Sequence, residues 1–201
     1  MNFLRYCPSK TKILCAINVE RLTLAYAQLW HQKVQPSIAT TSRPDRHWRW
    51  VQLYLLQKMG IAEGFCVTVA DQSGDAFPIG MILLKPASKA LDDNTKPEMY
   101  LWFLAAAPSA SLTANGISSE PVIGRALIDI AVTRSIAQGK GGRISLHAAK
   151  SGGSKLYEFY HEKCGLKNFP VARGGFRNDG RFFFTSAQYA RTFTYPWQNL
   201  R

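Results

Sequence analysis

The segment from Pro121 to Gln138 constrains the fold more than any other, because it has the features of one amphipathic helix. Its apolar residues recur at intervals of three and four, the spacing that gathers side chains on one helix face: Ile123, Ala126, Leu127, Ile130 and Ala131. Proline at the start and Gly139 after the end match the preferences of helix termini. A helix with these signals, flanked by the β-rich runs 99–107 and 143–149, is expected to pack against a sheet.

Five β-rich runs predict the strands of that sheet. The first two, 64–71 and 78–86, are separated by Gln72 to Asp75, a turn signal that predicts a hairpin. The other three lie at 99–107, 143–149 and 181–185. Together with the helices they predict an α/β (α+β) fold, in which a mixed, mostly antiparallel sheet is flanked by helices.

Three further helices are predicted from apolar spacing. The first covers residues 18–32, with the stripe Val19, Leu22, Tyr26, Leu29 and Trp30. The second follows the cap residues Ser42 and Asp45 and stops at Gly60, with the stripe Trp48, Val51, Leu55 and Met59. The third covers 153–164, with the stripe Leu156, Phe159, Tyr160 and Cys164. Two helices would therefore precede the sheet, and the stretch from Pro108 to Pro121 predicts a loop.

Length and composition favour a single domain, because 201 residues with 46% hydrophobic content can bury a core without metals or disulfides. The four cysteines show neither a CxxC pair nor zinc-finger spacing, so no metal site is predicted and a reducing cytoplasm is the expected compartment. The N-terminus lacks the apolar region of a signal peptide. The longest apolar run, 99–107, is about half the roughly 20 residues of a membrane-spanning helix, so no membrane partner is expected.

The formal net charge of +12 is concentrated at the two ends of the chain. Residues 121–201 carry 13 basic and four acidic side chains. A surplus of this size attracts nucleic acid, phosphorylated cofactors or acidic surfaces, and it repels polycationic ligands. Basic and aromatic residues also alternate from Arg43 to Trp50, a pattern found in proteins that bind nucleic acid by phosphate contact and stacking. Nucleic acid is therefore one class of expected partner.

The start of the helix at Pro121 offers a site for phosphate. The first backbone N–H groups of a helix have no partner within it, and the helix dipole favours an anion there. With proline at the first position, the N–H groups of Val122, Ile123 and Gly124 would face the anion, and Arg125 could add positive charge. Gly124 would let a pyrophosphate approach the backbone closely.

The chain from about Gly64 to Leu166 resembles the GNAT superfamily of N-acetyltransferases in four pieces that occur in the family's order. The pieces are the hairpin FCVTVADQSGDAFPIGMILL, the strand end LAAAP, the helix and strand GRALIDIAVTRSIAQGKGGRISLHA, and the segment KLYEFYHEKCGL. The resemblance implies one GNAT-like acyltransferase domain over 1–201. Its parts would be a helical acceptor-side part (1–63), an acetyl-CoA-binding core (64–166) and closing strands (167–201).

The resemblance also implies an activity and residue roles. The enzyme would transfer an acetyl group from acetyl-CoA, its co-substrate, to a primary amine by direct attack. The backbone of Leu104, Ala105 and Ala106 would lie beside the pantetheine arm, and the pyrophosphate would meet the helix start at Val122, Ile123, Gly124, Arg125 and Ala126. Tyr160 would be the catalytic acid, with Tyr157 in reserve, and Glu98 the base. The acceptor would be a small molecule, a peptide or an aminoacyl-tRNA.

Three departures from the family pattern leave other functions open. Ser119 and Val122 stand where the family's pyrophosphate loop has Gln or Arg and its first glycine. The segment before Gly124 is longer than usual, and Tyr160 to Gly165 is one residue longer than the usual spacing. The alternatives are a catalytically altered GNAT-fold binding protein and a basic protein that interacts with tRNA or other nucleic acid, similar to the superfamily's tRNA-acetylating toxins.

Overall fold

β3 (Glu63–Ala70) and β4 (Ala76–Lys89) form the hairpin predicted from the sequence. In the turn, the Asp71 N–H donates to the Asp75 carbonyl at 2.8 Å, and the Asp71 carboxylate accepts from the N–H groups of Ser73 and Asp75. An aspartate that binds its own turn in this way fixes where the two strands reverse. The other predicted strands form as β5 (Pro97–Ala106), β6 (Ile144–His147) and β8 (Phe182–Thr185).

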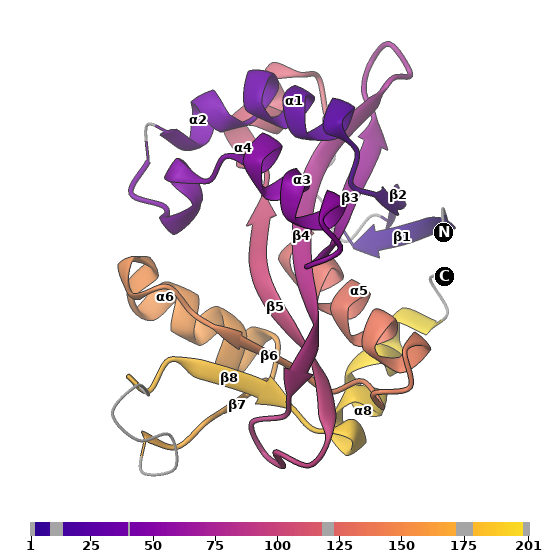
Figure 1. Cartoon of the computed structure of the whole chain (residues 1–201). Coiled ribbons are helices and arrows are strands. Elements are labelled where there is room, and N and C mark those ends of the chain that lie inside the picture. Colours follow the sequence, from indigo (N-terminus) through magenta and orange to yellow (C-terminus); the bar gives the residue numbers. More distant parts are fainter. Residues whose placement is uncertain (1–2, 9–13, 40, 118–122, 172–178, 199–201) are drawn as a thin grey trace. The chain divides into compact units, whose positions relative to one another are not determined.

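The computed structural model describes residues 3–8, 14–39, 41–117, 123–171 and 179–198 (Figure 1). Over these residues the strands form one eight-stranded sheet in the order β1-β2-β3-β4-β5-β6-β8-β7, where β1 is Phe3–Pro8, β2 is Leu14–Arg21 and β7 is Lys167–Asn168. β5 and β6 run parallel, whereas β1–β2, β2–β3, β6–β8 and β7–β8 are antiparallel pairs. The predicted α/β (α+β) fold with a mixed, mostly antiparallel sheet is confirmed.

The described chain packs as two compact units. One contains the residues up to Leu83 together with Phe103–Leu127, and the other contains Leu84–Trp102 and the residues from Ile128 onward. β4, β5 and the helix α5 (Ile123–Ala137) each pass from one unit into the other. Continuous strands and a helix therefore connect the two units. The single domain over 1–201 and its three parts stay a prediction.

The N-terminal segment differs from the prediction of two helices before the sheet. β2 occupies residues predicted to begin a helix, and it pairs with β3 so that Val19 lies opposite Val67. Ile17 and Val19 are buried while Asn18 is exposed, which is the period of two expected in a strand. The interval of three from Val19 to Leu22 imitates a helix because the strand ends within it.

α1 (Leu24–Lys33) begins at the cap residue Thr23, whose hydroxyl accepts from the Tyr26 N–H at 3.2 Å. α2 (Gln35–Ala39) and the short helix η1 (Pro44–His47) follow. α3 (Trp50–Lys58) then packs beside α1 (Figure 1). Helices therefore dominate residues 24–58, as the sequence predicts, although they start later than predicted.

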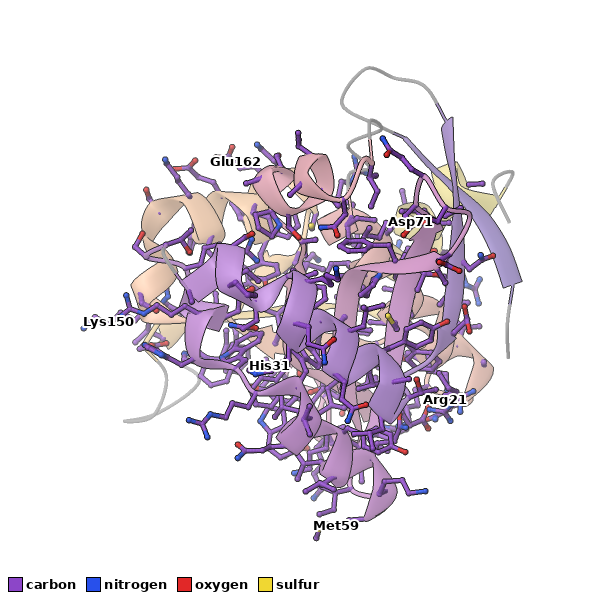
Figure 2. The ribbon with its side chains drawn as sticks, turned by 90° about the horizontal axis from the view of Figure 1, so that it is seen from above. Arg21, His31, Met59, Asp71, Lys150 and Glu162 are labelled. Carbon is purple, nitrogen blue, oxygen red and sulfur yellow. The ribbon has the colours of Figure 1, made fainter. Side chains whose placement is uncertain are left out.

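The predicted inner stripe of α3 is wrong. Trp50 is 1% exposed, whereas Leu55 is 55% and Met59 is 68% exposed. Met59 points away from the ribbon (Figure 2). Asp45 is not the cap of α3 either, since Arg49 precedes the helix and makes no capping bond. The helix starts five residues after Asp45, which rotates a different face toward the core.

Part of the stretch predicted as a loop before Pro121 is helical. α4 (Ser109–Ala114) forms there, with Ser111 and Leu112 buried. The Ser111 hydroxyl donates to the Lys33 carbonyl at 3.1 Å, which joins α4 to the end of α1. Residues 118–121 of the predicted loop, Ser119 among them, lie outside the described residues.

α5 forms the helix that the sequence predicts most strongly, and its predicted apolar face is inward. Its five stripe residues are each 4% exposed or less. Gly139 follows its end with φ at 73°, a conformation that glycine adopts without strain. A Cβ at Gly80 of β4 would stand 2.5 Å from Ile123 Cγ2. The missing side chain at Gly80 therefore lets the first turn of α5 lie close to the sheet.

The helix predicted over 153–164 forms, and one helix that was not predicted follows the last strand. η2 (Lys150–Gly152) leads into α6 (Gly153–Glu158), which continues as the π-helical turn η3 (Phe159–Lys163). After β8, α8 (Ala187–Gln198) forms where no helix was predicted. Among the α8 residues with described burial, Ala190 and Phe193 are buried. Within the described ranges, no helix has the length and apolar content needed to cross a bilayer.

Candidate functional site

β5 extends beyond its parallel neighbour β6. The pairing covers Met99–Leu101 against Ile144–Leu146, and β6 ends at His147, whereas β5 continues to Ala106. Backbone groups of a strand that are not used by a neighbouring strand remain available to another partner. The last residues of β5, among them the predicted pantetheine contacts, therefore form an edge that β6 does not cover.

The direction of the backbone separates the three predicted pantetheine residues. The Ala107 N–H donates to the Ile79 carbonyl of β4 at 2.8 Å. Because backbone N–H and C=O groups alternate in direction along a strand, those of Ala105 also point toward β4, and those of Leu104 and Ala106 point away from it. Ala105 is 1% exposed, while Leu104 and Ala106 are half-buried. Leu104 and Ala106 are thus the pair with backbone groups directed to the uncovered edge.

The start of α5 lies next to this strand end. Ile79 bonds to Ala107, and the adjacent residue, Gly80, faces Ile123 and Leu127 of α5. Of the predicted pyrophosphate residues, Ile123 and Ala126 are buried core residues, and Gly124 and Arg125 are half-buried in the first turn. Val122 lies outside the described residues. The end of β5 and the start of α5 therefore both lie against β4, at its adjacent residues Ile79 and Gly80.

Two side chains that flank the short helix η1 contact this same region. The Arg43 guanidinium donates to the Ala106 carbonyl at 2.8 Å and forms an ion pair with Asp45. Trp48 packs edge-on against Phe103 of β5, with ring centroids 4.9 Å apart. Sequence reasoning grouped Arg43 and Trp48 with a nucleic-acid motif, whereas the structure uses them to hold β5. Arg46, His47 and Arg49 of that motif are exposed.

Tyr160, the predicted acid, lies in the π-helical turn η3. The Cys164 N–H donates to the Phe159 carbonyl five residues earlier, so the turn contains one residue more than an α-helical turn. This accounts for the extra residue between Tyr160 and Gly165. Tyr160 is 6% exposed, and its ring contacts Phe183 of β8 at 5.7 Å. π-helical turns occur often at functional sites.

Tyr157, the reserve acid, lies near Tyr160 on α6. It also packs on Phe183, at 5.0 Å between ring centroids, and it is half-buried. The two tyrosines therefore share one aromatic support and differ in exposure. Their roles remain predictions.

Glu98, the predicted base, is a buried carboxyl near the start of β5. It is 2% exposed, the Ser145 hydroxyl donates to its Oε1, and the Leu91 N–H donates to its Oε2 at 3.3 Å. Burial raises the pKa of Glu98 to about 7, although the two hydrogen bonds oppose that shift. A carboxyl with both oxygens occupied joins β5 to β6 and to the preceding loop. The role of Glu98 as the base remains a prediction.

A histidine that the sequence did not single out lies at the end of β6. His147 Nε2 is 3.0 Å from Asp179 Oδ1 and 3.1 Å from Oδ2, and its ring lies 4.5 Å from that of Phe182. The Arg181 N–H also donates to Asp179, and the Arg181 guanidinium donates to the carbonyls of Ala148, Ala149 and Gly153. Arg181 thus holds the connection from β6 to α6. His147 and Asp179 are 32 residues apart in the chain, so no spacing rule could join them.

Among the residues that the structure describes, no three His, Cys, Asp or Glu side chains gather as metal ligands.

Comparison with known proteins gives a likeness in structure and none in sequence. No model of a protein family matches the chain, and no curated protein matches it. The crystal structure of AtaTR bound with acetyl-CoA has a TM-score of 0.57 and 14% identity, covering 88% of this chain and 96% of that chain. AtaT complexed with acetyl-methionyl-tRNAfMet gives 0.54 and 14%, covering 88% and 98%. A GNAT-family acetyltransferase from Staphylococcus aureus Mu50 gives 0.51 and 16%, covering 84% and 97%. These likenesses show the fold of the GNAT acetyltransferases.

Proposed function

We propose that this chain, whose fold is that of the GNAT acetyltransferases, is an acetyl-CoA-dependent N-acetyltransferase. The observation that carries the proposal is the edge of β5 at Leu104–Ala106, which β6 leaves uncovered beside the start of α5. An extended ligand with amide groups can bond to such an edge as an added strand would. The pantetheine arm of acetyl-CoA is an extended chain with two amides, and it ends in a pyrophosphate that suits a helix start.

In this proposal the pantetheine amides bond to the backbone of Leu104 and Ala106, and Ala105 packs behind them. The pyrophosphate binds the N–H groups at the start of α5, from Val122 to Gly124, with Arg125 and Ala126 in the same turn. Arg43 supports the arrangement because it holds the Ala106 carbonyl. The Leu104 and Ala106 N–H groups remain as donors for a ligand.

The reaction is a direct transfer. A neutral amine attacks the thioester carbonyl carbon, the C–N bond forms, and the C–S bond breaks as the tetrahedral intermediate collapses. Backbone N–H groups stabilise the oxyanion, and Tyr160 donates its hydroxyl proton to the departing thiolate, with Tyr157 as the alternative. A phenol with an ordinary pKa near 10 suits a thiolate leaving group. No covalent enzyme intermediate is needed.

The acceptor we propose is the amino group of an aminoacyl-tRNA. Residues 24–58 hold five lysines and arginines and one acid, Asp45, which is bound to Arg43. Basic side chains that bind phosphate favour an acceptor carried on a polyanion. The similar fold of AtaT, in its complex with acetyl-methionyl-tRNAfMet, supports the same class. The cytoplasm, which contains acetyl-CoA and tRNA, is the compartment we expect.

A thermal-shift titration with acetyl-CoA and with free CoA tests cofactor binding. At 100-fold excess over Kd, binding adds about 2.7 kcal/mol of stability, which corresponds to a Tm increase of about 5–10 °C for a chain of this size. Gly124→Glu should abolish the shift, because a carboxylate at the start of α5 repels the pyrophosphate but does not oppose the helix dipole. Gln52→Glu on the exposed side of α3 adds the same charge and should leave the shift unchanged.

Transfer is measured with labelled acetyl-CoA and three acceptors: charged tRNA, free amino acids and a short peptide. Label on tRNA alone supports the proposed acceptor. Label on the peptide would show that the acceptor is a peptide instead.

A GNAT-fold binding protein is the alternative favoured by the missing loop glycine at Val122. It would give the thermal shift without any transfer. Salt-sensitive RNA binding without a thermal shift would instead indicate a nucleic-acid-binding protein.

A further inference from the structure

The base that prepares the amine is the part of the proposed reaction for which Glu98 fits least well. Its carboxyl is buried, and its two oxygens accept from Ser145 and Leu91. A base for an incoming substrate must lie within hydrogen-bond reach of that substrate, and a carboxyl that is 2% exposed offers little access to one. The inference that follows rests on the proposed acetyltransferase function.

His147 lies on the same sheet face as Glu98, farther along in the direction of the parallel strands. In the strand registers Tyr100 is opposite Ser145, and His147 is opposite Phe182. Directly opposite residues share a face, and so do residues two apart in one strand. Glu98 and Tyr100 on β5 therefore share a face with Ser145 and His147 on β6.

His147 is also the last residue of β6, at the carboxyl end of the parallel pair. In open α/β sheets, ligands bind outside the carboxyl ends of parallel strands. The side chain of His147 is 36% exposed, so a ligand can reach it. Its position thus combines access with closeness to the point where β5 and β6 cease to pair.

Asp179 gives the imidazole a defined orientation. Both of its carboxylate oxygens lie within 3.1 Å of His147 Nε2. A carboxylate there favours a proton on Nε2, which leaves the lone pair on Nδ1. Asp179 is itself held by the N–H of Arg181, and the ring of Phe182 lies along the imidazole. Burial raises the pKa of Asp179, but its hydrogen bonds from His147 and Arg181 outweigh that effect, so its pKa is lowered and it stays ionised.

We propose that His147 is the general base for the acceptor amine, and that Asp179 is its positioning residue. One proton passes from the substrate ammonium to His147 Nδ1 and then to solvent, which leaves a neutral amine. That amine attacks the acetyl carbonyl carbon, and the tyrosine gives its hydroxyl proton to the departing thiolate. The attacking nitrogen then loses a second proton, which restores the tyrosine hydroxyl. The products are the acetamide, CoA thiol and one released proton. Asp179 remains a carboxylate throughout.

The other titratable and charged groups around His147 are few in the described chain. On β5 they are Tyr100, whose hydroxyl accepts from the His147 backbone N–H, and Glu98. On the other side Arg181 directs its guanidinium to the carbonyls of Ala148, Ala149 and Gly153, away from the imidazole. Asp179 is therefore the charged side chain that contacts the imidazole directly.

The test is the pH dependence of kcat/KM with the acceptor found above, measured for the wild type, His147→Gln and Glu98→Gln. Gln keeps a donor for Asp179 but has no titratable lone pair. We expect His147→Gln to lower kcat/KM about 10²-fold at pH 7. The loss should shrink to less than about threefold above pH 9, where an α-amine with a pKa near 8 has lost its proton unaided. Glu98→Gln should keep most of the activity at pH 7.

Asp179→Asn separates positioning from folding. It should lower kcat/KM about tenfold and leave the acetyl-CoA Kd unchanged, because the imidazole loses the carboxylate that orients it. Asp179→Glu should restore most of the wild-type kcat/KM. His31→Gln, an exposed histidine on α1 (Figure 2), serves as the control and should leave the profile unchanged.

Two results would overturn the inference while the acetyltransferase function stands. One is a His147→Gln protein that binds acetyl-CoA and keeps wild-type kcat/KM at pH 7. The other is a Glu98→Gln protein that loses activity at pH 7 and regains it at high pH, which would make Glu98 the base. A wild-type chain that neither binds acetyl-CoA nor transfers acetyl groups would overturn the proposed function, and this inference with it.

Discussion

Gly80→Ala tests how the sheet sets the position of the first turn of α5, the proposed pyrophosphate site. The added Cβ would stand 2.5 Å from Ile123 Cγ2 and 3.3 Å from Leu127 Cδ1. Ile123 is β-branched and 4% exposed, so its methyl group has little freedom to turn away. The first turn of α5 must therefore move, and with it the backbone N–H groups proposed to bind the pyrophosphate.

The magnitude follows from two opposing effects. One extra methyl group in a packed core costs about 1–3 kcal/mol, and alanine regains about 0.5–1 kcal/mol that glycine loses within a strand. The free energy of unfolding should thus fall by up to about 2.5 kcal/mol, which lowers Tm by up to about 10 °C. Loss of one pyrophosphate hydrogen bond would raise the Kd for acetyl-CoA about tenfold.

The assay pairs thermal melts with calorimetric titration of acetyl-CoA. Gly64→Ala on β3 is the matched control, because the three atoms nearest to its Cβ, at 2.8–2.9 Å, belong to Gln57 and Leu22 and none to α5. It should lower Tm and leave Kd unchanged. Ile123→Ala alone should cost about 2–5 kcal/mol. The variant that combines Gly80→Ala with Ile123→Ala should be at least about 0.5 kcal/mol more stable than the summed effects of the two single substitutions predict. The methyl group added to β4 fills part of the cavity that Ile123→Ala leaves. A Gly80→Ala protein that melts lower yet binds acetyl-CoA with wild-type affinity would refute the reasoning.

Three further changes give independent checks. Tyr160→Phe should lower kcat about 10²-fold with an unchanged acetyl-CoA Kd; if Tyr157→Phe alone shows that loss, Tyr157 is the acid. The pKa of Glu98 is raised from its ordinary value of 4.5 to about 7 in the folded protein, so its contribution to stability is complete below about pH 4.5 and is lost as the pH rises to 7. Melts of Glu98→Gln should show a smaller fall in Tm over that range, and an equal fall would contradict the assignment. Arg181→Lys should lower the free energy of unfolding by about 1.5–3 kcal/mol, because an ammonium cannot reach three carbonyls as a guanidinium does; a neutral result in denaturant titrations would exclude this role.

The central elements could be predicted because local signals agree with their tertiary surroundings. Asp71 binds its own turn, and the inner face of α5 repeats with the helical period along the helix. The N-terminal part could not be predicted as well, because the interval from Val19 to Leu22 spans the end of β2 and has helical spacing. Only pairing with β3 decides between them, and pairing is not local.

The candidate site was predictable in its backbone and less so in its side chains. The strand end at Leu104–Ala106 and the start of α5 follow from the order of elements. By contrast, the bond from Arg43 to Ala106 and the pair of His147 with Asp179 join residues far apart in sequence. Such contacts exist only after the chain has folded, so spacing gives no sign of them.

The π-helical turn at Phe159–Lys163 separates sequence distance from position in space. A helix can take in one more residue by widening a single turn, and the elements on both sides keep their places. A motif with fixed spacing between its tyrosine and its glycine would count this residue as a mismatch, although the glycine still ends the helix. Insertions of this kind therefore reduce the similarity of two sequences faster than they change the fold.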